Sequence, residues 1–86
     1  MEKEYKWIMD KDGKITSEDG SVTITKLSKD KWNVFDLYDD VIKICGTKEA
    51  ALDAGASKIW SNEVGDFVHL LRHVKFSHSV ESEADK

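Results

Sequence analysis

The sequence predicts an α+β fold in which an antiparallel β-meander of three to five strands is followed by two α-helices packed on one face. From residue 5 to residue 45, short segments with a hydrophobic period of two alternate with turn signals, which is typical of a meander. After Cys45 the apolar residues recur at helical spacing. There is no proline and no repeat, so we expect a single domain over residues 1–79.

The strands follow from β-branched and aromatic residues in alternation. Residues 21–27 are the clearest strand, because Val22 and Ile24 face one way while threonines face the other. Residues 31–37 and 41–45 flank an acidic turn and are predicted to form a hairpin. Two further strands are expected at residues 5–9 and 14–17, with turns at Gly13 and Gly20.

Two helices and a tail are predicted after this meander. Thr47 is placed to cap a helix over residues 48–60, and Ser61 or Asn62 to cap a second one that runs to about residue 76. Residues 80–86 have almost no apolar content and are expected to form a disordered acidic tail. The expected buried positions are Leu52, Gly55, Ala56 and Ile59 in the first helix and Val64, Phe67, Val68, Leu71 and Val74 in the second.

Composition excludes several classes of protein. Cys45 is the only cysteine of the 86 residues, so an internal disulfide and a cysteine-based zinc knuckle are both excluded. No run approaches the roughly 20 apolar residues of a membrane span, and the first residues lack the apolar stretch of a secretory signal, so a cytoplasmic location is expected. The net charge of −4 opposes binding to DNA phosphates. No cofactor is predicted.

The outer side of the second predicted helix is one candidate binding face. His69, Arg72, His73 and Phe76 recur at helical spacing, and Lys75 and His78 flank them. Such a face can contact phosphate or carboxylate and stack on a base, as in RNA recognition. The alternative is a solvated polar face on which Phe76 closes the core. His69 and His73 have chelating spacing, but the glutamate of the H-E-x-x-H motif is absent, so no metal site is predicted.

The acidic turn of the hairpin is the other candidate. Asp36, Tyr38, Asp39 and Asp40 crowd its tip, and neighbouring carboxylates can serve acid–base or metal chemistry. Hairpin tips are also acidic simply for solubility. No nucleophile, base and orienting group can be assigned together, so the sequence predicts no enzyme. An acidic patch that meets a basic partner protein is the favoured use.

Three tryptophans are many for so short a chain. Trp7, Trp32 and Trp60 do not all fit inside a small core, so one is expected to be partly exposed. An exposed tryptophan is favoured at interfaces, which allows a homodimer contact.

Two resemblances bear on function. The segment W-N-V-F-D at residues 32–36 and the segment V-I-K-I-C-G-T-K-E-A-A-L at residues 41–52 resemble the hairpin-then-helix core of AP2-type and integrase arm-binding domains. That resemblance implies a sheet that reads DNA, but aspartates stand at the tip where those families need arginine and lysine. In size and style the chain also resembles accessory proteins of large tailed bacteriophages, which implies counter-defence or host takeover by stoichiometric binding.

The sequence therefore predicts a small non-catalytic binding protein, an inhibitor or regulator that acts by stoichiometric protein–protein contact. The alternative is an RNA-binding regulator, for example an RNA-assisted inhibitor of a toxin or nuclease, that uses the basic face of the last helix. DNA is the least favoured partner.

Overall fold

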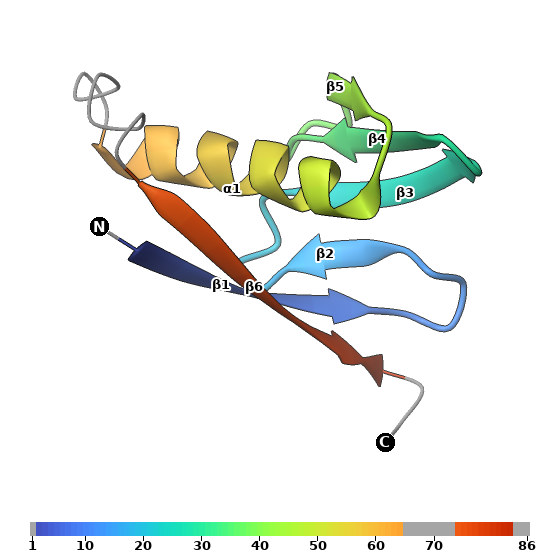
Figure 1. Ribbon diagram of the computed structural model, residues 1–86, viewed down its shortest axis with the longest axis horizontal. Helices are drawn as coiled ribbons and strands as arrows, with labels where there is room; N and C mark the ends of the chain where they lie inside the picture. The colour runs from blue at the N-terminus through green and yellow to red at the C-terminus, as the bar shows by residue number, and fades with distance from the viewer. Residues whose placement is uncertain (1, 65–73, 84–86) are drawn as a thin grey trace.

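The computed structural model describes residues 2–64 and 74–83, which form a six-stranded mixed sheet with one helix packed on it (Figure 1). The sheet order is β5-β4-β3-β2-β1-β6. Neighbouring strands from β1 to β5 are antiparallel, whereas β6 is parallel to β1. The elements are β1 (Glu2–Met9), β2 (Ile15–Ser17), β3 (Thr23–Ser28), β4 (Lys31–Phe35), β5 (Val41–Cys45), α1 (Lys48–Val64) and β6 (Lys75–Ser82).

The predicted meander is confirmed with five strands. Turn chemistry at both ends of β2 explains its register. Gly13 and Gly20 have φ values of 85° and 79°, in the left-handed region where a glycine is unstrained. In the first turn, the Asp10 carboxylate accepts hydrogen bonds from the backbone N–H groups of Asp12 and Lys14, at 2.9 Å each.

The helix α1 begins as predicted but ends later. Thr47 Oγ1 accepts a hydrogen bond from the Ala50 N–H at 3.1 Å, which confirms the predicted cap. The predicted end near residue 60 and the second cap at Ser61 or Asn62 are wrong, because α1 continues to Val64. Serine and asparagine are weak helix formers rather than breakers, and no glycine or proline stops the helix there. Within the described ranges, no helix is long and apolar enough to cross a membrane.

The second predicted helix is wrong at its described end. Lys75 and Phe76 open β6 instead, and residues 65–73 lie outside the described part of the chain. Phe76, His78 and Val80 are half-buried, while Lys75 and Glu81 are exposed, so the segment has the period of a strand. Pairing with β1 over eight residues supplies its backbone with partners. Because β6 extends to Ser82, the disordered tail predicted from residue 80 is also wrong over residues 80–82.

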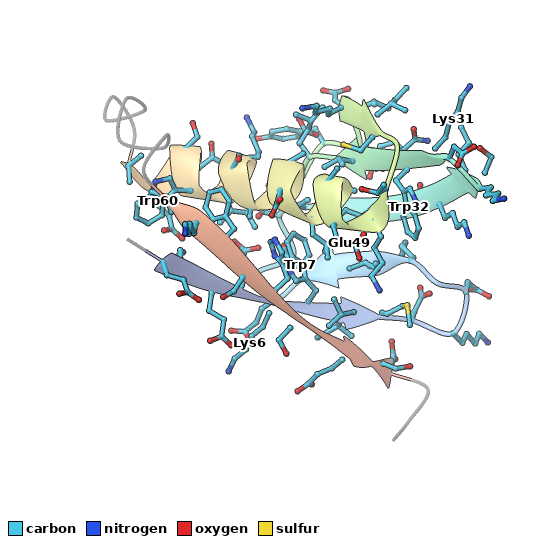
Figure 2. The ribbon with its side chains drawn as sticks, in the orientation of Figure 1. Lys6, Trp7, Lys31, Trp32, Glu49 and Trp60 are labelled. Atoms are coloured by element: carbon cyan, nitrogen blue, oxygen red, sulfur yellow. The ribbon has the colours of Figure 1, made fainter. Side chains whose placement is uncertain are left out.

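The core lies between α1 and one face of the sheet. Five large side chains are essentially inaccessible to solvent: Trp7, Ile15, Ile24, Val22 and Val34. From α1, the buried residues Ala51, Leu52, Gly55, Ala56 and Ile59 include all four positions predicted for its inner face. The three tryptophans are spaced along this layer (Figure 2). Trp7 is fully buried, whereas Trp32 and Trp60 are both half-buried, so two rather than one are partly exposed.

Close approach of α1 to the sheet depends on Gly55. A Cβ atom at this position would lie 2.8 Å from Val22 Cγ1 and 3.0 Å from Trp7 Cη2, both closer than van der Waals contact allows. Val22 and Trp7 are themselves fully buried, so neither can move aside without disturbing its neighbours. This contact sets the spacing between the two layers.

The variant Gly55→Ala is therefore expected to lower the free energy of unfolding by about 1–3 kcal/mol, because overpacking outweighs the better helix propensity of alanine. Urea unfolding followed by tryptophan fluorescence measures the change. Gly46→Ala is the matched control, since a Cβ atom at Gly46 would meet only the Asp30 carbonyl oxygen, at an unstrained 3.9 Å. Equal stability of the two variants would contradict the role assigned to Gly55.

The turn between β2 and β3 is held by Asp19. Its Oδ1 accepts hydrogen bonds from Ser17 Oγ at 2.6 Å, from the Ser21 N–H at 3.0 Å and from Ser21 Oγ at 2.8 Å. Burial alone raises the pKa of this carboxyl, but the hydrogen bonds from Ser17 and Ser21 outweigh burial and lower the pKa below its usual value.

A carboxyl whose pKa is lowered by folding stabilises the protein above its unfolded pKa of about 3.9 and loses that effect as the pH falls through the folded value. Acidification should therefore destabilise the wild type more than Asp19→Asn, which has nothing to titrate there. Urea midpoints at a series of acidic pH values measure the difference. Asp12→Asn is the control, since the Asp12 side chain accepts no hydrogen bond within the described residues. Parallel curves for the wild type and Asp19→Asn would refute the assignment.

Candidate functional site

The hairpin of β4 and β5 carries several exposed apolar side chains, and a cluster of aspartates lies at its tip. Tyr38 is 80% exposed, and Ile44 in the edge strand is 59% exposed. Monomeric proteins rarely expose contiguous apolar patches of large side chains unless they mark an interaction site. We call this set the hairpin surface; it consists of Asp36, Leu37, Tyr38, Asp39, Asp40, Val41, Ile42 and Ile44.

The tip of the hairpin is a hydrogen-bonded loop organised by Asp36. Its Oδ1 accepts from the Tyr38 N–H at 2.8 Å and from the Asp40 N–H at 3.0 Å. Its backbone N–H donates to the Asp40 carbonyl at 3.0 Å, and its carbonyl accepts from the Asp39 N–H at 3.1 Å. Asp39 has φ 62°, a left-handed conformation that aspartate tolerates better than most residues. The loop thus holds Leu37 and Tyr38 outward on a fixed backbone.

The hairpin tip therefore brings together the four predicted site residues, which are Asp36, Tyr38, Asp39 and Asp40. Their roles differ. Asp36 uses one carboxylate oxygen to build the loop. Asp39 and Asp40 are exposed, and their side chains make no hydrogen bond or ion pair among the described residues. These two carboxylates supply the negative charge that a partner would meet.

The strand β5 extends the surface along the edge of the sheet. Its described neighbour in the sheet is β4 alone, so the backbone groups on its other side point outward. Cys45 is buried opposite Trp32, so the adjacent Ile44 faces the other way, beside Asn33 on the face opposite α1. Sequence reasoning missed Leu37, Val41, Ile42 and Ile44, because an apolar run such as V-I-K-I is typical of a strand that is covered on both faces.

The second predicted face is not seen as a unit. His69, Arg72 and His73 lie outside the described residues, so their predicted role stays a prediction. Lys75 and Phe76 lie in β6, at the edge of the sheet opposite β5. Lys75 is exposed, but the ring of Phe76 packs edge-on against Tyr5, with centroids 5.7 Å apart. Lys75 and Phe76 are adjacent in β6, so their side chains lie on opposite faces of the sheet.

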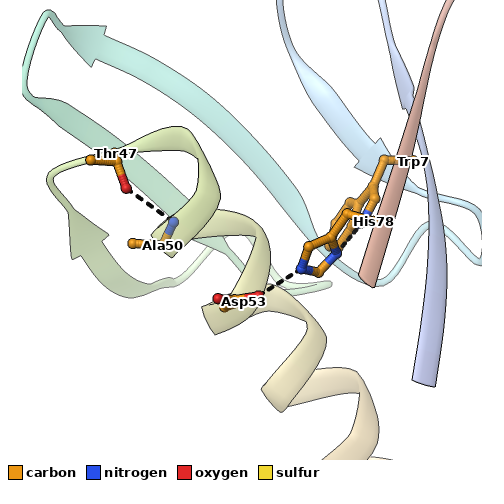
Figure 3. A network of polar contacts seen from close by, with 5 residues as sticks. All are labelled: Trp7, Thr47, Ala50, Asp53 and His78. Atoms are coloured by element: carbon orange, nitrogen blue, oxygen red, sulfur yellow. Dashed lines mark hydrogen bonds and ion pairs between the residues drawn. The ribbon is translucent and has the colours of Figure 1, made fainter. Parts of the chain in front are cut away.

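His78 has a structural contact that the sequence did not suggest. The Trp7 Nε1–H donates to His78 Nδ1 at 3.0 Å, and His78 Nε2 lies 2.7 Å from Asp53 Oδ1 (Figure 3). Because Nδ1 accepts from the indole, the proton of the neutral ring lies on Nε2 and points to the carboxylate. Both ring nitrogens are engaged, so His78 ties β6 to β1 and to α1 rather than offering a free base.

The part of the chain that the structure describes contains no candidate set of metal ligands. In residues 2–64 and 74–83, no group of three or more histidine, cysteine, aspartate or glutamate side chains is arranged to hold a metal ion.

Comparison with protein families, with curated proteins and with solved structures found no match to this chain. The assignment of the candidate site therefore depends on the geometry of the hairpin surface alone. The resemblances inferred from sequence stay predictions.

If Asp36 organises the loop, Asp36→Ala should lower the free energy of unfolding by about 1 kcal/mol, because two backbone N–H groups lose their acceptor. Asp36→Asn should be closer to the wild type, since an amide oxygen can accept the same two bonds. Thermal unfolding measures stability, and the amide shifts of Tyr38 and Asp40 report the loop. A loss as large in Asp36→Asn as in Asp36→Ala would point to charge instead of hydrogen bonding.

Proposed function

We propose that this protein works by stoichiometric binding of a partner protein through the hairpin surface, as an inhibitor or regulator. The observation that carries the proposal is the exposure of five apolar side chains on one hairpin and edge strand, with three aspartates at its tip. Burial of such side chains on association supplies affinity. Tyr38 is of the type that most often forms the energetic centre of an interface.

Charge indicates what kind of partner fits. Asp39 and Asp40 would meet lysine or arginine on a partner, and opposite charges at a rim accelerate association and fix the orientation. Two copies of this chain each carry a net charge of −4 and repel each other, so a basic partner is favoured over a second copy.

The edge of β5 indicates how the partner docks. An extended segment can pair with an edge strand through backbone hydrogen bonds and place alternate side chains against the sheet. Val41, Ile42 and Ile44 line that edge, and Lys43 lies among them. A basic segment in extended conformation, paired with β5 and followed by lysine or arginine at the acidic tip, satisfies all these features.

The test begins with affinity capture on the tagged protein, identification of the bound protein, and calorimetry with both purified. Leu37→Ala and Tyr38→Ala should each weaken binding about tenfold or more, as expected at the centre of an interface. Leu27→Ala is a matched control, because Leu27 is 63% exposed and Leu37 is 65% exposed. Leu27 lies outside the hairpin surface, next to the last residue of β3. This control should change the affinity less than twofold.

Three outcomes would overturn the proposal. Equal weakening by Leu27→Ala would place the contact elsewhere. A concentration-dependent dimer in sedimentation equilibrium, abolished by Ile44→Asp, would make a second copy the occupant. Turnover of a substrate by the purified protein, lost on a single substitution in a pocket, would replace binding with catalysis.

A further inference from the structure

The edge of the sheet opposite the hairpin surface is formed by β6. Among the described residues, this strand pairs with β1 alone. The backbone groups of successive residues in a strand point to opposite sides, so half of those in β6 point away from β1. Short strands, bulges and prolines commonly protect such an edge. β6 has none of these, because it is eight residues long, contains no proline and pairs with β1 in unbroken register.

The side chains of β6 divide between two faces of the sheet. The His78 ring points toward α1 (Figure 3). Phe76 and Val80 lie two positions to either side, on the same face, where they pack against the core and stay half-buried. Lys75 and Glu81 lie on the opposite face and are exposed. Both faces therefore leave side-chain surface at the edge that an added strand could cover.

The sequence of β6 is self-complementary about His78. In the run K-F-S-H-S-V-E at residues 75–81, the residues equidistant from His78 are a lysine and a glutamate, a phenylalanine and a valine, and two serines. If two antiparallel copies of this strand lie side by side with His78 opposite itself, each Lys75 is directly opposite a Glu81 and each Phe76 is opposite a Val80. Directly opposite side chains have Cβ atoms about 4.5–5.5 Å apart and are the pairs that stabilise a sheet.

Symmetry limits the registers in which two such edges can pair. A two-fold axis perpendicular to the sheet makes the two strands antiparallel and keeps both copies of α1 on one face. Opposite side chains then share a face, so a residue on the axis lies opposite its own copy. An axis at Ser77 would place Phe76 opposite His78, and an axis at Ser79 would place Phe76 opposite Ser82. Of these three axes, only the one at His78 matches both the charged and the apolar residues.

We propose that two copies of this chain associate through β6 in the register centred on His78, which joins their sheets edge to edge. Backbone hydrogen bonds across the axis pair the groups that the edge leaves open. The contact of Phe76 with Val80 buries apolar surface, and the contact of Lys75 with Glu81 fixes the register. The hairpin surface lies at the other edge of the sheet and stays accessible, so this dimer does not depend on the partner proposed for that surface.

The charge of the chain permits this contact. Each copy carries a net charge of −4, which opposes association. At physiological salt, however, exposed charges farther apart than about 8 Å are largely screened. The charges that meet along β6 have opposite signs, whereas the aspartates of two hairpin tips would repel each other. A second copy therefore fits the β6 edge better than it fits the hairpin surface.

Sedimentation equilibrium of the full chain tests the proposal. Between about 10 µM and 1 mM the wild type should show a reversible dimer, as expected for a contact smaller than a standard interface. Lys75→Glu and Glu81→Lys should each weaken it about tenfold or more, because two attractive pairs become two repulsive ones. Both side chains are exposed, so each variant should stay folded, which circular dichroism checks. Ile44→Asp, in the hairpin surface, should leave the dimer unchanged.

Mixing the two single variants gives the sharpest result. An equimolar mixture of Lys75→Glu and Glu81→Lys chains should form a heterodimer as strong as the wild-type dimer, because every opposite pair regains opposite charges. The double variant that carries both substitutions should dimerise alone for the same reason. A charge effect confined to one chain would not produce this exchange.

Four results would refute the dimer. They are a wild type that stays monomeric up to 1 mM, at the upper end of the range for so small a contact, a dimer that persists in both single variants, a mixture that stays monomeric, and a dimer lost in Ile44→Asp. The last result would transfer the contact to the hairpin surface. A hairpin partner whose binding is unaffected by Lys75→Glu would leave the proposed function standing in each case except the last.

Discussion

The contact of Gly55 with Val22 and Trp7 determines where α1 lies, and much else follows from that position. With the helix backbone this close to the sheet, Asp53 reaches His78, and Ile59 and Glu63 overhang the first half of β1. A larger residue at this point would lift the helix and open both contacts. The same short distance leaves little room between the layers, so the side chains that fill it are few and fully buried.

Features specified by neighbouring residues could be predicted from the sequence. The alternation at Val22 and Ile24, the β4–β5 hairpin and the Thr47 cap are each decided within a few positions, and each is found. The acidic cluster at Asp36 to Asp40 was also identifiable, because the aspartates are consecutive or nearly so. Its loop geometry follows from the ability of aspartate to bond the backbone two and four positions on.

Features decided by distant partners could not be predicted. The segment from Lys75 to Ser82 has mixed periodicity, and pairing with β1 from the other end of the chain makes it a strand. Exposure of Val41 and Ile44 depends on β5 being an edge strand, which sheet order alone decides. Tyr5 is an ordinary strand residue in the sequence, and burial of its hydroxyl without a hydrogen-bond partner among the described residues depends on residues far along the chain, such as Phe76.

The parallel pairing of β6 with β1 has a kinetic consequence. The hydrogen bond from Trp7 to His78 joins residues 71 positions apart, and closing so long a loop is entropically costly. High contact order of this kind slows folding, because the loop must close before the contact stabilises anything. Until β6 docks, β1 presents a bare edge beside a large indole, a combination that favours misassembly between chains. Docking of β6 onto β1 is therefore the step that commits the chain to productive folding instead of aggregation.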